Sequence, residues 1–182
     1  MSKEIKALEV AKVFLRFSNE NRTADDSDNV TQMKLQKLLY YAQGYYLAEY
    51  GTPLFKEKIY AWDHGPFIKE VYAAYCNHGR NEIIDYDTEN NVNVEYLPFL
   101  SKIYDRFGKY TAYQLRNMTH SETPWKSTEQ KKEIKLSIIE SFFNKVVESE
   151  FIKNIKELES GTSEYTEYSM DDLKKLASDQ TS

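Results

Sequence analysis

The sequence is poor in the residues that mark several large classes of protein. Its 182 residues include one cysteine, Cys76, four prolines and six isolated glycines. A single cysteine excludes an internal disulfide framework and fits a reducing compartment. No glycine-rich phosphate loop is present, and no apolar run approaches the roughly 18 residues of a membrane-spanning helix. Met1–Lys6 also lacks the apolar stretch of a signal peptide, so we expect a cytoplasmic protein.

An excess of positive charge is also absent. The net charge is −5; residues 1–147 carry 20 acidic and 20 basic side chains, whereas residues 148–182 carry 9 and 4. A neutral body without a basic stripe argues against nucleic acid as a partner. We predict one domain over residues 1–160 and an acidic, mobile tail over residues 161–182. The alternative is that the acidic end is an arm for a basic partner.

Aromatic and periodic apolar residues, in contrast, are abundant, with 15 tyrosines and 9 phenylalanines. Their spacing predicts a mainly α (α+β) fold: a compact helical domain with one small β element around Ile59–Trp62 and a second candidate strand region within Ile83–Tyr96. Thr31 is suited to cap one helix, and Gly51 to end it. The predicted helices span about residues 3–17, 31–50, 66–76, 96–107, 111–118 and 137–160, with a short last helix from residue 169.

The turn after the predicted strand is the most informative segment. Pro66 has a φ preset for helix and no N–H to lose, so it is predicted to begin a helix after Gly65. In the structural interpretation Trp62 fills the core and Asp63 accepts N–H groups at the helix start. In the functional interpretation the turn presents Asp63 and His64, beside Trp62, to a partner protein. The two are compatible, because a rigid turn is a good platform.

The second helix carries a further apolar stripe. Met33, Tyr40 and Leu47 recur at seven-residue spacing on the side opposite the main apolar face. A helix with two apolar sides commonly lies in the middle of a bundle. The alternative is an exposed stripe that accepts a partner's helix or a second copy of this chain, which would make a homo-oligomer.

Four ordered segments carry a resemblance to a known family. They are Lys34–Gln43, Gly51–Phe55, Ala61–Pro66 and Glu70–Tyr72, which together span roughly the middle half to two-thirds of the chain. In these segments the chain resembles the SocA/Panacea-like antitoxin family, whose members are also known as phage-associated proteins. The Gly-Pro turn is the most specific element. Relatives vary at the two residues before that turn, so the resemblance implies a conserved turn and no specific chemistry.

This resemblance implies a non-enzymatic protein-binding module. Its partner would be a cognate toxin protein, neutralised sterically when an aromatic and apolar surface covers the toxin's working site. One branch of the family resembles proteolytic adaptors, which implies a AAA+ protease as a further partner of the toxin-bound protein.

Two other functions are alternatives. A hydrolase would use His64 and Asp63 in a deep pocket with shifted pKa values. A nucleic-acid-binding regulator would use a local patch of Lys34, Lys37 and Lys58. No ligand spacing or catalytic signature is present, so we expect no catalytic residue, no metal site and no cofactor. The scattered residues considered for metal or thiol chemistry are Glu70, Cys76, His78 and His120.

Overall fold

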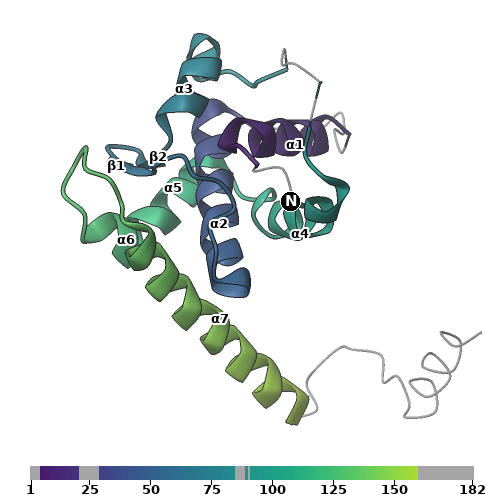
Figure 1. Ribbon diagram of the computed structural model, residues 1–182, viewed down its shortest axis with the longest axis vertical. Helices are drawn as coiled ribbons and strands as arrows, with labels where there is room; N and C mark the ends of the chain where they lie inside the picture. Colours follow the sequence, from purple (N-terminus) through teal and green to yellow (C-terminus); the bar gives the residue numbers. More distant parts are fainter. Residues whose placement is uncertain (1–4, 21–28, 85–88, 90, 160–182) are drawn as a thin grey trace, which may run out of the picture. The chain divides into compact units, whose positions relative to one another are not determined.

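The computed structural model describes residues 5–20, 29–84, 89 and 91–159. These residues form a mainly helical protein with one two-stranded antiparallel sheet (Figure 1), so the predicted fold class is confirmed. The chain divides into two compact units, residues 1–147 and 148–182, and the sites below all belong to the first. The elements are α1 (Ala7–Glu20), α2 (Gln32–Tyr50), β1 (Tyr60–Trp62), β2 (Gly65–Phe67), α3 (Lys69–Tyr75), η1 (Cys76–His78), η2 (Val94–Tyr96), α4 (Leu97–Phe107), α5 (Ala112–Ser121), α6 (Thr123–Lys126) and α7 (Leu136–Glu159).

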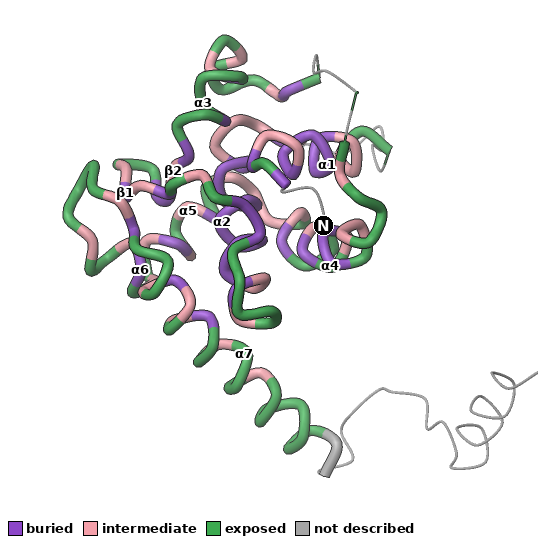
Figure 2. Tube along the Cα trace, viewed as in Figure 1, coloured by how far each residue is buried: buried purple, intermediate pink, exposed green. Residues whose placement is uncertain are grey.

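Helix α2 is the central element of the first unit. It contacts α1, α3, α4, α5 and β2 and is buried along most of its length (Figure 2). Thr31 caps it by accepting a hydrogen bond from the Lys34 N–H at 3.3 Å, and Gly51 ends it with φ 68°. Tyr40 and Leu47 are 0% and 4% exposed. The stripe that contains them therefore lies inside the bundle, as expected for a helix with two apolar sides.

The first half of α7 packs on α2 through Phe143. A Cβ atom at Gly44 would overlap the Phe143 ring, so only glycine leaves room for this ring. Tyr40 and Tyr45 meet the same ring edge-on, at centroid distances of 5.5 and 5.1 Å. In the second unit α7 continues to Glu159, and residues 151–157 are exposed (Figure 2). The predicted tail and last helix lie outside the described residues.

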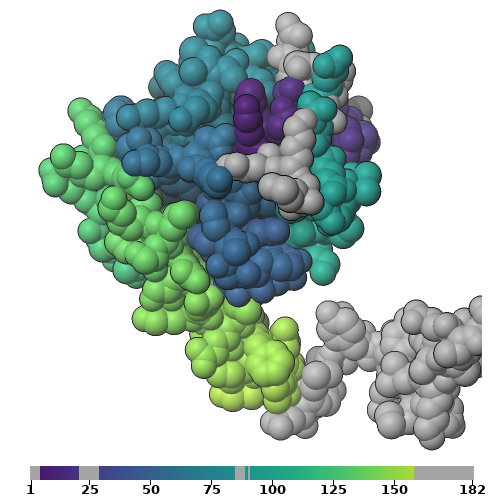
Figure 3. Space-filling model, in the orientation of Figure 1, coloured from purple at the N-terminus to yellow at the C-terminus, as the bar shows by residue number. Residues whose placement is uncertain are grey.

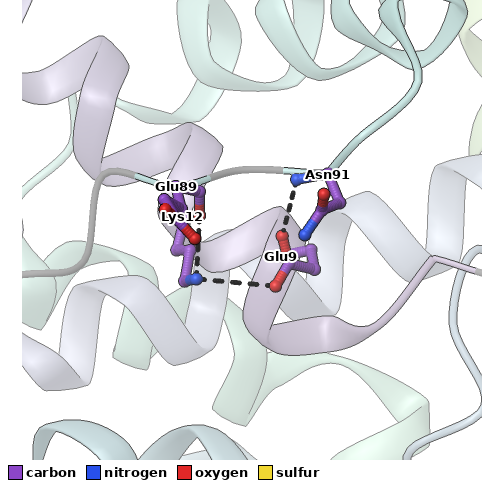
Figure 4. A network of polar contacts seen from close by, with 4 residues as sticks. All are labelled: Glu9, Lys12, Glu89 and Asn91. Atoms are coloured by element: carbon purple, nitrogen blue, oxygen red, sulfur yellow. Dashed lines mark hydrogen bonds and ion pairs between the residues drawn. The ribbon is translucent and has the colours of Figure 1, made fainter.

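A polar network ties the chain before η2 to α1 (Figure 4). The Lys12 ammonium donates to the Glu89 carbonyl at 2.9 Å and lies 3.5 Å from the Glu9 carboxylate. That carboxylate also accepts the Asn91 N–H at 3.0 Å. Two hydrogen bonds thus hold the loop against α1, and the ion pair within α1 links them.

Strands β1 and β2 form a hairpin, where a strand, a turn and a helix were predicted. Asp63 and His64 are the two turn residues between the paired Trp62 and Gly65. Pro66 lies within β2, and helix α3 begins only at Lys69. The prediction that Pro66 begins a helix was therefore wrong.

A third segment explains why proline is tolerated in β2. Pro66 faces Ala61 across the hairpin. The Ala61 N–H donates to Lys132 and its carbonyl accepts from Lys131, at 2.9 and 2.6 Å, on the opposite edge of β1. The ladder therefore needs no donor from residue 66, which is the condition under which proline enters an edge strand.

The second predicted β region is not found among the described residues of Ile83–Tyr96. Val94–Tyr96 forms the 3-10 turn η2, because the Asn93 side chain accepts the Glu95 N–H and starts a helical turn instead.

Within the described part of the chain, none of the helices has both the length and the apolar character needed to cross a lipid bilayer.

Candidate partner-binding site

A pocket of about 260 Å³ lies between the start of α2 and the hairpin. Its walls are mainly aromatic and aliphatic. The Trp62 and Phe67 rings stack at a centroid distance of 5.2 Å, and Tyr72 leans on Phe67 at 5.2 Å. Tyr72 is 46% exposed and is therefore accessible to a partner at the pocket edge. The lining residues are Gln32, Met33, Gln36, Lys37, Trp62, His64, Gly65, Phe67 and Tyr72.

The hairpin turn is exposed and rigidly placed. Asp63 and His64 are both exposed. Gly65 has φ 98°, and a Cβ atom there would lie 2.7 Å from Lys37 Cε and 2.8 Å from Thr119 Oγ1. Glycine is required at this position for both conformation and space. The turn therefore sits directly on α2 and α5.

The structural role predicted for Asp63 is wrong. Helix α3 has Ile68 at its N-cap position, with no side-chain cap. Its start is held from α2 instead: the Ile68 N–H donates to Gln36 Oε1 at 2.8 Å, and Gln36 Nε2 donates to the Ile68 carbonyl at 3.1 Å. Because the hairpin separates Asp63 from Lys69, the carboxylate is too far along the chain to act as the cap.

Trp62 lies at the edge of the pocket and is only partly buried, so it does not fill the core as predicted. Its carbonyl accepts a hydrogen bond from Trp125 Nε1 at 2.9 Å. Trp125 in turn stacks on His120 with a centroid distance of 3.8 Å and an angle of 8°. These contacts fix the β1 end of the turn against α5 and α6.

Lys37 is a buried cation at the pocket. It is 2% exposed, and its ammonium donates to the Pro66 carbonyl at 2.9 Å. Burial, and then repulsion from Arg116, lower the pKa of Lys37 to about 7. Burial likewise lowers the pKa of His120, with further effects from Arg116, Lys37 and His64. Helices α2 and α5 and the hairpin turn thus bring Lys37, Arg116, His120 and His64 close to one another.

A largely buried carboxylate, Glu122, lies between α5 and α6. Glu122 accepts hydrogen bonds from the Tyr40 and Tyr41 hydroxyls at 2.9 and 2.8 Å. Burial raises the pKa of Glu122 to about 7, although both hydroxyls act in the opposite direction. Burial, then the charge of Glu122, raises the pKa of both tyrosines. This network ties the centre of α2 to the α5–α6 junction.

We predict that Glu122→Gln stabilises the fold above pH 7 and has little effect below pH 4.5. The folded state holds the Glu122 proton up to about pH 7, against 4.5 for an ordinary carboxyl. The contribution of Glu122 to the free energy of unfolding of the wild type is therefore complete below pH 4.5. It falls by about 3 kcal/mol as the pH rises through 7. Urea unfolding at both pH values tests this, with exposed Glu129→Gln as the control. An equal effect of Glu122→Gln at the two pH values would contradict it.

The structure brings some of the predicted site residues together and separates others. Met33, Trp62, His64 and Gly65 line one pocket. Tyr40 and Leu47, from the same predicted stripe, are buried and inaccessible to a partner in this structure.

The predicted basic patch is absent. Lys34 and Lys37 are 1% and 2% exposed. Lys58 is exposed but lies 2.9 Å from the Glu133 carboxylate. The three lysines therefore offer no shared positive surface for a phosphate backbone, which removes the basis of the nucleic-acid alternative.

The structure provides only one of the two residues that the hydrolase alternative requires at the pocket. His64 lines the pocket, whereas Asp63 does not. Among the described residues, no group of three or more His, Cys, Asp or Glu side chains is placed to hold a metal ion. Cys76 and His78 lie in η1, at the far end of α3 from the hairpin.

Five lining residues were not predicted as part of a partner-binding site: Gln32, Gln36, Lys37, Phe67 and Tyr72. The sequence could have pointed to Gln36 and Lys37, because both are polar residues within a largely apolar helical segment. Both Phe67 and Tyr72 fall in the helix predicted over residues 66–76. Phe67 lies in β2 instead, and Tyr72 lies in α3 as predicted, at the pocket.

The hairpin and pocket lie largely within a known family domain. The model of the family described as Antitoxin SocA-like, Panacea domain, matches residues 35–126, from the first turn of α2 through α6. This is half of the chain, and the chain belongs to this family. Antitoxin SocA of Caulobacter vibrioides (strain NA1000 / CB15N) is 38% identical over 56 residues, which are 31% of this chain and 30% of that protein. The match thus spans less than a third of that relative. No solved structure matches this chain.

Proposed function

We propose that the protein is an antitoxin that neutralises a cognate toxin by direct contact through the surface around the hairpin pocket. Membership of the SocA-like family supports the antitoxin role. The observation that carries the proposed contact site is the mainly apolar pocket of about 260 Å³ beside the hairpin turn. A preformed apolar pocket with a few polar groups is the usual form of a site that anchors a partner's side chain.

The pocket is suited to an apolar side chain. Trp62, Phe67 and Tyr72 supply aromatic rings, and Met33 adds an adaptable thioether.

The pocket would be the centre of a larger contact surface. Specific protein interfaces bury about 1,200–2,000 Å² in total, so the exposed turn residues Asp63 and His64 would lie in its surroundings. Aromatic anchors near the centre of such surfaces dominate the binding free energy. Tyr72 is the most exposed aromatic residue of the pocket lining and is its expected anchor.

Co-expression with the gene next to its own tests the proposal. The neighbouring product should stop growth when expressed alone, and this protein should restore growth. Tyr72→Ala should fail to restore it, whereas Tyr113→Ala, which removes an exposed tyrosine of α5 outside the pocket, should behave as the wild type. Rescue that disappears in a strain without its ATP-dependent proteases would favour the adaptor mechanism over direct contact. A harmless neighbouring product would contradict the antitoxin role.

A further inference from the structure

Four aromatic rings gather at the C-terminal end of α2, away from the hairpin. Tyr46, Tyr50, Tyr96 and Phe99, with Glu95, line a second pocket of about 380 Å³. Tyr46 and Tyr50 come from the last turns of α2. Glu95 and Tyr96 come from η2, and Phe99 from the first turn of α4. Figure 3 shows the end of α2 at the surface beside α4. Tyr50 is 51% exposed and Phe99 only 8%, so the group has a buried base and an accessible wall.

The four rings pack against one another beside the pocket. Tyr46 lies 4.4 Å from Tyr50 and 6.1 Å from Tyr96, measured between ring centroids. Phe99 stands nearly perpendicular to Tyr46 and to Tyr50, at 81° and 75°. Ring faces carry negative electrostatic potential, so aromatic residues that line a pocket favour a cation there.

The polar groups at this pocket are also negative. Glu95 is part of its lining, and the Tyr50 hydroxyl is hydrogen-bonded to the Glu49 carboxylate. The last turn of α2 contains no basic residue to balance the negative end of the helix dipole. None of the five lining residues is a lysine or an arginine. The pocket therefore combines aromatic walls, a carboxylate and a helix C-terminus, all of which favour positive charge.

Other aromatic residues of this protein already hold a cation. Lys69 lies 4.0 Å from the centre of the Tyr60 ring, Arg106 lies 5.0 Å from Tyr45, and Lys131 lies 5.8 Å from Trp62. Within the described residues, none of the cation–ring contacts involves the four rings of the second pocket. The second pocket therefore has the composition of a cation site, while its rings make no contact of this type with a lysine or arginine of the described residues.

We propose that Tyr46, Tyr50, Tyr96, Phe99 and Glu95 form a binding site for an alkylammonium group. The group would enter past Tyr50, contact the ring faces and place its charge near Glu95. Its source is either the side chain of a lysine on another protein or a small quaternary ammonium compound, since both carry a positively charged nitrogen bonded to alkyl carbon. The inference is independent of the antitoxin proposal, because the site and its chemistry are separate from the hairpin pocket.

Titration of the full-length protein with choline tests the site. Protein labelled at the tyrosine ring carbons is followed by NMR, at constant ionic strength. We expect saturable shifts of the Tyr46, Tyr50 and Tyr96 resonances. Neohexyl alcohol, in which a carbon atom replaces the choline nitrogen, has the same shape without the charge and should bind several-fold more weakly. Equal binding of the two compounds, or no saturable shift with choline, would overturn the proposal.

Variants connect the binding to this pocket. Tyr50→Leu removes one exposed ring and should weaken choline binding about three- to tenfold, as expected for one cation–π contact. Glu95→Gln should weaken it in the same direction, and Tyr113→Leu should leave it unchanged. Unchanged binding in Tyr50→Leu would refute the site. A parallel titration with Nα-acetyl-lysine methylamide distinguishes the sources: the probe that binds more tightly identifies a protein side chain or a free quaternary ammonium as the ligand.

Discussion

Replacing Gln43 with leucine is expected to destabilise the fold by roughly 3 kcal/mol or more, because three buried backbone groups lose their partner. Gln43 is 0% exposed. Its Oε1 accepts the N–H groups of Leu54 and Phe55 at 2.9 and 3.2 Å, and its Nε2 donates to the Phe55 carbonyl at 2.9 Å. The side chain thus holds the segment after Gly51 against α2. Leucine has a similar volume, so the expected loss comes from the polar groups and not from a cavity.

Urea unfolding monitored by circular dichroism measures this effect. Gln130→Leu is the control, because Gln130 is exposed and its replacement should change stability by less than about 0.5 kcal/mol. A loss below about 1 kcal/mol for Gln43→Leu would mean that water or a rearranged loop replaces these hydrogen bonds.

Phe143→Ala is expected to cost about 3–5 kcal/mol, the usual range for removing a buried phenylalanine. Phe143 is 1% exposed, and it contacts the rings of Tyr40, Tyr41, Tyr45 and Phe142. Its loss would leave a cavity between α2 and α7. The same unfolding assay should show this variant to be far less stable than Phe151→Ala, whose ring is 64% exposed.

Gly44 provides a matched test of the same contact. In the wild type Gly44→Ala should destabilise the fold by about 1–3 kcal/mol, because the new methyl group overlaps the Phe143 ring. In the Phe143→Ala background it should instead stabilise by about 1 kcal/mol, the gain in helix propensity over glycine. The same sign in both backgrounds would show that α7 does not pack on α2 as described.

Short-range signals in the sequence predicted the elements of the fold well. Thr31 and Gly51 define both ends of α2, since capping depends on residues within one helical turn. The Thr111–Gln114 capping box likewise starts α5. These features need no knowledge of the rest of the chain, which is why they could be predicted.

Long-range contacts decided what the sequence did not predict. The hairpin exists because residues 131–134 pair with the other edge of β1, more than 60 residues away, as in the Ile134 N–H bond to the Ile59 carbonyl at 2.8 Å. The same applies to Gln36, which replaces the predicted Asp63 cap at the start of α3. Neither partner is close in sequence, so local pattern favoured a helix at Pro66.

The candidate site was predicted in part for the same reason. Trp62 and His64 were expected at an accessible turn, and Met33 on the second side of α2, but nothing in their spacing placed them around one pocket. Tyr40 and Leu47 share the stripe of Met33 but are buried, and Phe143 of α7 contacts the Tyr40 ring. Only Met33 lines the pocket, because it lies in the first turn of α2, beside the hairpin.

Isothermal titration calorimetry with the purified product of the neighbouring gene tests most directly whether the hairpin pocket anchors a toxin protein. Tyr72→Ala should weaken binding about 30-fold, the effect of losing one anchoring aromatic side chain, while Tyr113→Ala should bind as the wild type does. Binding of Tyr72→Ala within about twofold of the wild type, with the fold intact by circular dichroism, would contradict the claim.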